Sequence, residues 1–368
     1  PRAVFQREGM SGKLVRRMIE GDQLRDWSAA TGDFAIFPYD DQFKALPIPV
    51  LENEHHFMWS YRTGLANNLM FGKQTKVEAG LNWWEYGRLT SNKLREPLSI
   101  AFPEVATHNH FVLDRGGKVF KNSAPVIKLP AGASEEEHVG LLGLLNSSVA
   151  CFWLQQVCHN KGRPGAEVAG ADERFEMRYS INASNVAEVP LCEGRPTKLA
   201  ALLDRLAVLR STTQPSAILG EPQADFRPLP TRADLDAAHS KFASVSAQMV
   251  AAQEELDWHC LGLYGLLPAG AAERFEHLSP PEVCLGERAF EIVLARRVAA
   301  GKEITVWFER HGSNMITEIP AHWPEDYRHV VQRRIDLIES DRKIGLIERP
   351  EFKRRWNSPR WEDLEQTA

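Results

Sequence analysis

The chain has 368 residues, of which 43% are hydrophobic and 25% charged, and its formal net charge is −5 at pH 7. This length allows two or three domains, each with its own core, and the composition is typical of soluble globular proteins. No apolar run is long enough to cross a bilayer and no signal-peptide pattern opens the chain, so we expect no membrane partner. The five cysteines are odd in number and scattered, which favours the cytoplasm and argues against a disulfide framework.

The charge is unevenly distributed along the chain. Between Ser60 and Pro130 there are ten Lys/Arg and five Asp/Glu, which makes this stretch locally +5 (ten less five) within an acidic chain. Such a stretch can neutralise DNA phosphates without making the whole protein basic. A solvated surface with chance clustering explains the same count.

Residues 1–192 predict a mixed α/β (α+β) domain. Apolar runs at 34–37, 98–102 and 126–129 predict strands. Residues 110–113 and 118–120 predict a hairpin, because Asp114-Arg115-Gly116-Gly117 between them supplies glycines for a tight turn. Ser134 and Glu137 have capping-box spacing before an apolar helix that we expect to run from Val139 to Val157.

The rest of the chain predicts two further units. Residues 193–267 predict a helical spacer whose long helix is started by Thr231 with Asp234. Its apolar residues from Leu235 to Leu256 stand at alternating steps of three and four. That spacing is a heptad seam, which predicts packing along a partner helix. Residues 268–368 predict a small α+β accessory domain, with paired strands at 290–294 and 304–308 and a helix at 327–338.

The motifs of an enzyme are not found. An amino-methyltransferase needs a Gly-rich loop for S-adenosylmethionine and an Asp/Asn/Ser-Pro-Pro-aromatic motif, whose ring stacks on the flipped base. The nearest match, Ser279-Pro280-Pro281-Glu282, ends in Glu and follows no predicted strand. There is no P-loop motif, and neither His108/His110 nor Cys151/Cys158/His159 has a matching second pair for zinc. We therefore expect no cofactor, no metal and no catalysis in this chain alone.

A series of short motifs runs through the chain in a fixed order. They stand at residues 21–27 (GDQLRDW), 35–39 (AIFPY), 83–86 (WWEY), 100–103 (IAFP), 106–110 (ATHNH), 111–114 (FVLD), 123–125 (SAP), 144–147 (LLNS), 189–190 (VP), 320–324 (PAHWP) and 327–328 (YR). The early ones resemble the target-recognition domain of single-chain adenine methyltransferases. The whole series resembles the C-terminal half of the BREX type 2, or phage growth limitation, adenine-specific DNA methyltransferase family.

This resemblance implies sequence-specific recognition of double-stranded DNA in a phage-defence system. It also implies a partner, the N-terminal methyltransferase domain, which would carry S-adenosylmethionine and methylate adenine N6. The chain starts with Pro1 inside structured sequence, so we expect it to be a piece of such a protein. Other phage-defence proteins are possible partners.

The candidate DNA contacts are polar or basic residues on predicted loops and turns, where side chains can reach phosphates and base edges. They are Lys73, Gln74, Lys76, Thr107, His108, Asn109, His110, Arg115, Lys118, Lys121, Lys161 and Arg163. For each, an ordinary solvated or sheet-capping loop is the alternative. Trp83, Trp84 and Tyr86 can either stack on a displaced base or belong to a core.

Two alternatives to the DNA-recognition hypothesis stay open. The heptad seam and the acidic net charge favour a scaffold that docks other defence proteins, whereas the local +5 stretch disfavours it. A separate specificity subunit of a restriction enzyme is the second alternative, although such subunits usually carry two tandem recognition domains and this chain has no internal repeat.

Overall fold

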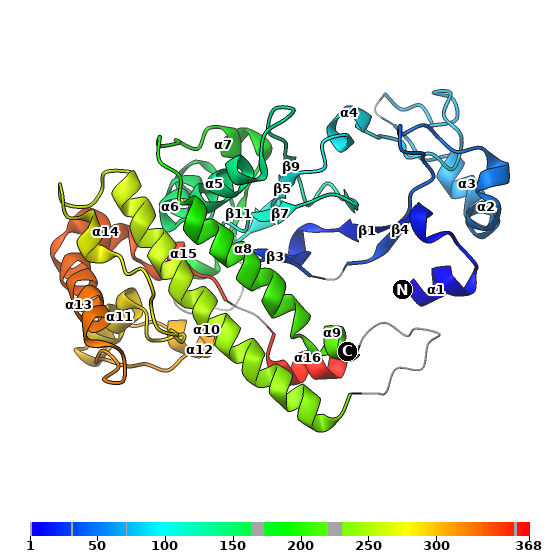
Figure 1. The fold of residues 1–368 in the computed structure, drawn as a ribbon. Helices are drawn as coiled ribbons and strands as arrows, with labels where there is room; N and C mark the ends of the chain where they lie inside the picture. Colours follow the sequence, from blue (N-terminus) through cyan, green and yellow to red (C-terminus); the bar gives the residue numbers. More distant parts are fainter. Residues whose placement is uncertain (1, 31, 71, 163–172, 220–229, 357–358) are drawn as a thin grey trace.

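The computed structural model describes residues 2–30, 32–70, 72–162, 173–219, 230–356 and 359–368. The fold is mixed α/β, with small sheets in the first half of the chain and helices in the second (Figure 1). The α-helices are α1 (Arg2–Arg7), α2 (Glu52–Trp59), α3 (Arg62–Ala66), α4 (Ser91–Leu94), α5 (Glu135–Leu145), α6 (Ser148–Val157), α7 (Ala183–Ala187), α8 (Thr197–Thr212), α9 (Pro215–Leu219), α10 (Arg232–Leu263), α11 (Ala289–Ala299), α12 (Trp307–His311), α13 (Glu325–Ser340), α14 (Arg342–Ile347), α15 (Pro350–Lys353) and α16 (Trp361–Thr367).

The strands are short and form separate sheets. They are β1 (Val15–Ile19), β2 (Leu24–Arg25), β3 (Ser28–Ala29), β4 (Phe34–Ile36), β5 (Ser99–Ala101), β6 (Val105–Ala106), β7 (Val112–Asp114), β8 (Lys118–Phe120), β9 (Val126–Ile127), β10 (His159–Gly162) and β11 (Arg178–Ser180). Their orders within the described residues are β4-β1-β8, β10-β11-β6, β2-β3 and β7-β5-β9. The strands predicted at 34–37, 98–102 and 126–129 are confirmed as β4, β5 and β9.

The predicted hairpin is wrong, although both of its strands and its turn exist. Gly116 and Gly117 adopt φ angles of 98° and 79°, as a tight turn requires. Strand β7, however, pairs with β5, whereas β8 pairs in parallel with β1. The turn residues determine where the chain reverses direction. The strand with which each segment pairs depends instead on sheet edges formed by residues far away in the sequence.

The helix predicted from Val139 to Val157 is two helices, α5 and α6. The capping box at its start is confirmed, because Ser134 accepts from the backbone N–H of Glu137. Ser147 then caps a new helix by accepting from the backbone N–H of Ala150. The polar residues at 146–148 are therefore a helix boundary.

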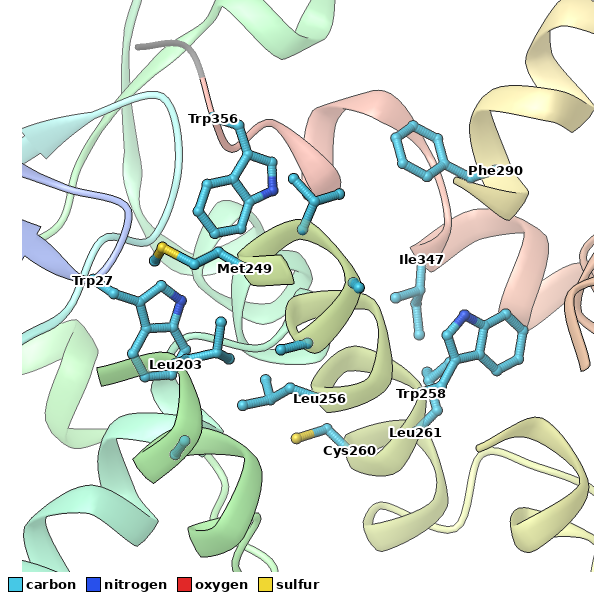
Figure 2. Close-up of a cluster of buried hydrophobic side chains, with 14 of the residues drawn as sticks. Trp27, Leu203, Met249, Leu256, Trp258, Cys260, Leu261, Phe290, Ile347 and Trp356 are labelled. Atoms are coloured by element: carbon cyan, nitrogen blue, oxygen red, sulfur yellow. The ribbon is translucent and has the colours of Figure 1, made fainter. Parts of the chain in front are cut away.

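Helix α10 lies in the middle of the hydrophobic core. It starts at the predicted capping box, Thr231 with Asp234, and its seam residues are buried or half-buried where it packs along α8. Figure 2 shows the buried part of α10 with Trp27 and Leu203 on one side and Phe290 on the other. One hydrophobic cluster thus draws residues from all three predicted segments, and the division into domains stays a prediction. Across the described residues, no helix is both long and apolar enough to cross a membrane.

The strands predicted after residue 268 are wrong. Residues 290–294 lie in α11 and residues 307–308 in α12, and in 268–356 and 359–368 the structure has helices and turns but no strand. All residues of α11 from Ala289 to Ala295 are buried, and Glu291 is the one charged residue among them, so this part of the sequence shows no polar face that would reveal a helical period. The helix predicted at 327–338 is confirmed as α13.

A buried cluster of charges joins the end of α15 to α10. The Nζ of Lys353 lies 3.1, 2.9 and 3.2 Å from carboxylate oxygens of Glu254, Asp257 and Glu348. All four side chains are nearly inaccessible to water. Burial raises the pKa of Glu348 to about 7; Glu254 and Asp257 add to the shift and Lys353 opposes it.

This cluster predicts a pH dependence of stability. Folded Glu348 keeps its proton up to about pH 7, whereas the unfolded side chain loses it near 4.5, so the folded state binds more protons between these values. Glu348 should therefore contribute a fall in the free energy of unfolding of about 2 kcal/mol as pH rises from about 5.5 to 7, whereas buried His108 and His110, whose pKa values are lowered, contribute in the opposite direction. Over this range, the free energy of urea unfolding of the parent chain should therefore fall by about 2 kcal/mol relative to that of Glu348→Gln, which resembles the protonated form.

The matched control for that measurement is Glu136→Gln, which removes an exposed carboxyl on α5. It should keep the pH dependence of the parent chain. Identical pH profiles for the parent and Glu348→Gln would contradict the prediction.

Candidate nucleic-acid interface

The polar segment at 107–110 lies inside the molecule, contrary to the expectation of an exposed loop. His108, Asn109 and His110 are 2%, 1% and 4% exposed, and Thr107 is half-buried. Asn109 donates to the carbonyls of Leu145 and Ser147 at 2.7 and 2.9 Å. His108 and Asn109 contact α6 and the end of α5, and His110 accepts from the backbone N–H of Asp26. These three side chains are therefore buried inside the molecule and do not form the expected DNA-facing loop, whereas Thr107 stays partly exposed.

The two histidines of this segment are neutral packing groups. Burial lowers the pKa of both His108 and His110 well below the ordinary value, and Arg355 acts in the same direction. His108 Nδ1 lies 3.3 Å from Cys151 Sγ. Burial raises the pKa of Cys151 to about 12, so its thiol is not an activated nucleophile. Among the described residues, no three His, Cys, Asp or Glu side chains are grouped as metal ligands would be.

Residues near the C-terminus form hydrogen bonds with segment 107–110 and its neighbours. Arg355 is buried and donates to the carbonyl oxygens of Asn109 and Asn146 at 2.7 and 2.8 Å. The next residue, Trp356, donates its backbone N–H to Asp26 at 3.0 Å. Residues 353–356 look like a basic tail in the sequence but are an internal link between the two halves of the chain.

The cations at and after the predicted hairpin are each paired with an acid. Arg115 contacts Glu135 and Asp204, both at 2.6 Å. Lys118 pairs with Asp114, and Lys121 lies 2.5 Å from Glu20. The sequence shows these acidic residues, but it does not show which of them pairs with which cation. A phosphate would have to compete with these carboxylates.

Two of the three candidates at 73–76 are on the surface. Lys73 and Gln74 are exposed on a turn, where Gly72 and Lys73 adopt left-handed φ angles of 101° and 69°. Lys76 is only 3% exposed and donates to the carbonyl of Glu85 at 2.7 Å, contrary to its expected role as a phosphate contact. Burial lowers its pKa.

The remaining loop candidates and the aromatic residues at 83–86 differ in their exposure. Lys161 is exposed on β10, while Arg163 lies outside the described residues. Tyr86 packs against Phe37 and donates to the carbonyl of Ile36, so it belongs to a local core. The rings of Trp83 and Trp84 meet edge to face and are half-buried.

An open groove of about 540 Å³ lies between α1 and the β4-β1-β8 sheet. Arg16, Arg17 and Lys118 line it together with the glycine turn at 116–117, and none of the described lining residues is acidic. The parallel register of β1 and β8 sets Arg17 beside Lys118. The groove therefore gathers three basic residues, of which Lys118 is paired with Asp114, and such a concentration of positive charge can attract phosphates.

Aromatic rings orient the two arginines of the groove. The Arg16 guanidinium lies 3.6 Å from the centre of the Phe37 ring, and that of Arg17 lies 5.7 Å from the Phe34 ring. Burial lowers the pKa of Arg16. Sequence reasoning missed both arginines because they precede the basic stretch at 60–130. Two consecutive arginines between apolar residues were the available signal, but only the fold brings Arg17 beside Lys118.

Comparison with known proteins agrees with the motifs. The chain is 43% identical over 371 aligned residues, 99% of its length, to the adenine-specific methyltransferase PglX of Streptomyces coelicolor, and it spans 30% of the length of that relative. Residues 249–368 match a family model described as a domain of unknown function (DUF7008), which starts within α10. Over nearly its whole length, the chain is therefore similar to part of an adenine-specific methyltransferase, which confirms the resemblance predicted from its motifs.

Proposed function

We propose that this chain is the DNA-recognition part of an adenine-specific DNA methyltransferase of a phage-defence system. The observation that carries the proposal is the 43% identity to PglX across 99% of the chain. The chain corresponds in this proposal to the C-terminal part of such an enzyme. The remaining length would bind S-adenosylmethionine, flip the target adenine and methylate it, in the cytoplasm.

Within this proposal, the groove between α1 and the β4-β1-β8 sheet is the phosphate-binding surface. Its support is the presence of Arg16 and Arg17 in a lining without acidic residues among those described, next to Lys118, which pairs with Asp114. Lys73, Gln74 and Lys161 are exposed and remain candidates for further contacts with DNA. The acid-paired Arg115, Lys118 and Lys121 would contact phosphate only by exchanging partners.

The proposal predicts sequence-selective, salt-sensitive binding to duplex DNA. Retention of random duplexes by the 368-residue chain at low and moderate salt, followed by sequencing, should enrich one short motif. Arg17→Gln should weaken binding to all sequences and reduce the slope of log affinity against log salt by about 1, because one phosphate contact is lost. Affinity can be measured by fluorescence anisotropy.

Arg342→Gln is the matched control, because it removes an exposed arginine of α14, outside the groove. It should leave the salt slope unchanged. Absence of any duplex binding at low salt would overturn the proposal. If the slope of log affinity against log salt is the same for Arg17→Gln and the control, the groove is not the phosphate-binding surface.

A further inference from the structure

A pair of exposed aromatic side chains stands at the junction of α2 and α3. Trp59 and Tyr61 are 54% and 60% exposed, whereas the other aromatic side chains with described burial are largely or partly covered. Leaving a tryptophan and a tyrosine in water forgoes the large burial that such rings normally contribute. Their exposure therefore needs an explanation outside the free fold.

The exposed rings are held in place by other rings. Trp59 lies 5.5 Å from the ring of His55 and 6.1 Å from that of Trp83, and the Trp83 ring meets Trp84. Tyr61 lies 6.0 Å from Phe57. A ring held in this way presents a surface that loses little conformational freedom when another flat group stacks on it.

The charge around these rings suits a nucleic acid. The guanidinium of Arg62 lies 4.7 Å from the centre of the Trp59 ring. Residues 59–77 contain no Asp or Glu, and their exposed cations are Arg62 and Lys73. The exposed residues of this segment also include the amides Asn67 and Asn68, which can pair with base edges.

We propose that Trp59 and Tyr61 stack on unpaired nucleobases of DNA, with Arg62 facing the phosphate backbone. Stacking needs an open base face, and in an intact duplex the neighbouring base pairs cover both faces. The surface should therefore prefer single-stranded or locally unpaired DNA. This inference rests on the proposed function, because it takes DNA as the ligand, and it adds a second contact outside the groove.

The test compares a short single-stranded oligonucleotide with the intact duplex of the same sequence, by fluorescence anisotropy with the 368-residue chain. Trp59→Ala should weaken single-strand binding on the order of tenfold and change duplex binding little, because one stacked base is lost. Trp59→Phe, which keeps a ring, should retain most of the affinity. Trp59→Leu, which keeps apolar volume without a ring, should not.

Leu278→Ala is the matched control, since it shortens a fully exposed apolar side chain outside this surface. Thermal unfolding of each variant would show that Trp59 substitutions leave the fold intact. Unchanged single-strand binding by Trp59→Ala, with duplex binding intact, would overturn this inference and leave the proposed function standing. No DNA binding by the parent chain would instead overturn the proposed function.

Sedimentation of the chain without DNA tests the alternative that this surface is a contact between copies of the protein. If the parent chain self-associates and Trp59→Ala abolishes this with DNA affinity unchanged, the surface is a protein contact and the stacking inference is wrong. The stacking inference is supported if the parent chain stays monomeric, Trp59→Phe keeps most of the affinity for single-stranded DNA, and Trp59→Leu loses it.

Discussion

Replacing Lys353 by Met is expected to destabilise the fold by about 3 to 5 kcal/mol. The ammonium group is the one cation within 3.2 Å of Glu254, Asp257 and Glu348 among the described contacts of this cluster. Methionine fills similar volume but leaves three buried carboxyls without a cation, and among the described contacts only Asp257 keeps hydrogen bonds, from the backbone N–H of Ser148 and the side chain of Gln253. Their mutual repulsion and lost solvation are both costs of the folded state.

Urea unfolding followed by circular dichroism measures this effect. Lys343→Met, an exposed lysine on α14, is the matched control and should change stability by less than about 0.5 kcal/mol. The penalty for Lys353→Met should shrink as pH falls, because protonated carboxyls need no cation. A loss below about 1 kcal/mol at neutral pH would contradict the central role given to this cluster.

Replacing Asn146 by Ala is expected to cost about 3 kcal/mol, because it leaves the buried backbone N–H and carbonyl of Phe111 without partners and removes one acceptor of Arg355. Asn146 donates to the carbonyl of Phe111 at 2.8 Å and accepts from its backbone N–H at 3.0 Å. Its side-chain oxygen also accepts from Arg355 at 3.1 Å. Alanine would strand these buried groups where water cannot replace the lost bonds.

Unfolding in urea again provides the measurement. Asn122→Ala removes an exposed asparagine and serves as the control, with little expected change. A variant Asn146→Ala as stable as this control would show that the link between residues 109–111 and Arg355 is not important to the fold.

The sequence predicted local features that depend on neighbouring residues. The capping boxes at Ser134 and Thr231, the turn glycines at 116–117 and strand β5 all follow from chemistry within a few positions. The motif series also indicated the methyltransferase resemblance. These signals survive because backbone capping and φ preference need no distant partner.

The tertiary structure decided which polar side chains face water. His108, Asn109 and Lys353 are residue types that often bind ligands, but here they are buried. Asn109 and Lys353 form hydrogen bonds or ion pairs with residues distant in the sequence. Arg16 and Arg17 were not predicted as DNA contacts, but the parallel pairing of β1 with β8 brings Arg17 beside Lys118, and both arginines line the same groove. Whether a polar residue is a ligand or an internal tie depends on contacts far apart in the chain, and those form only when the fold closes.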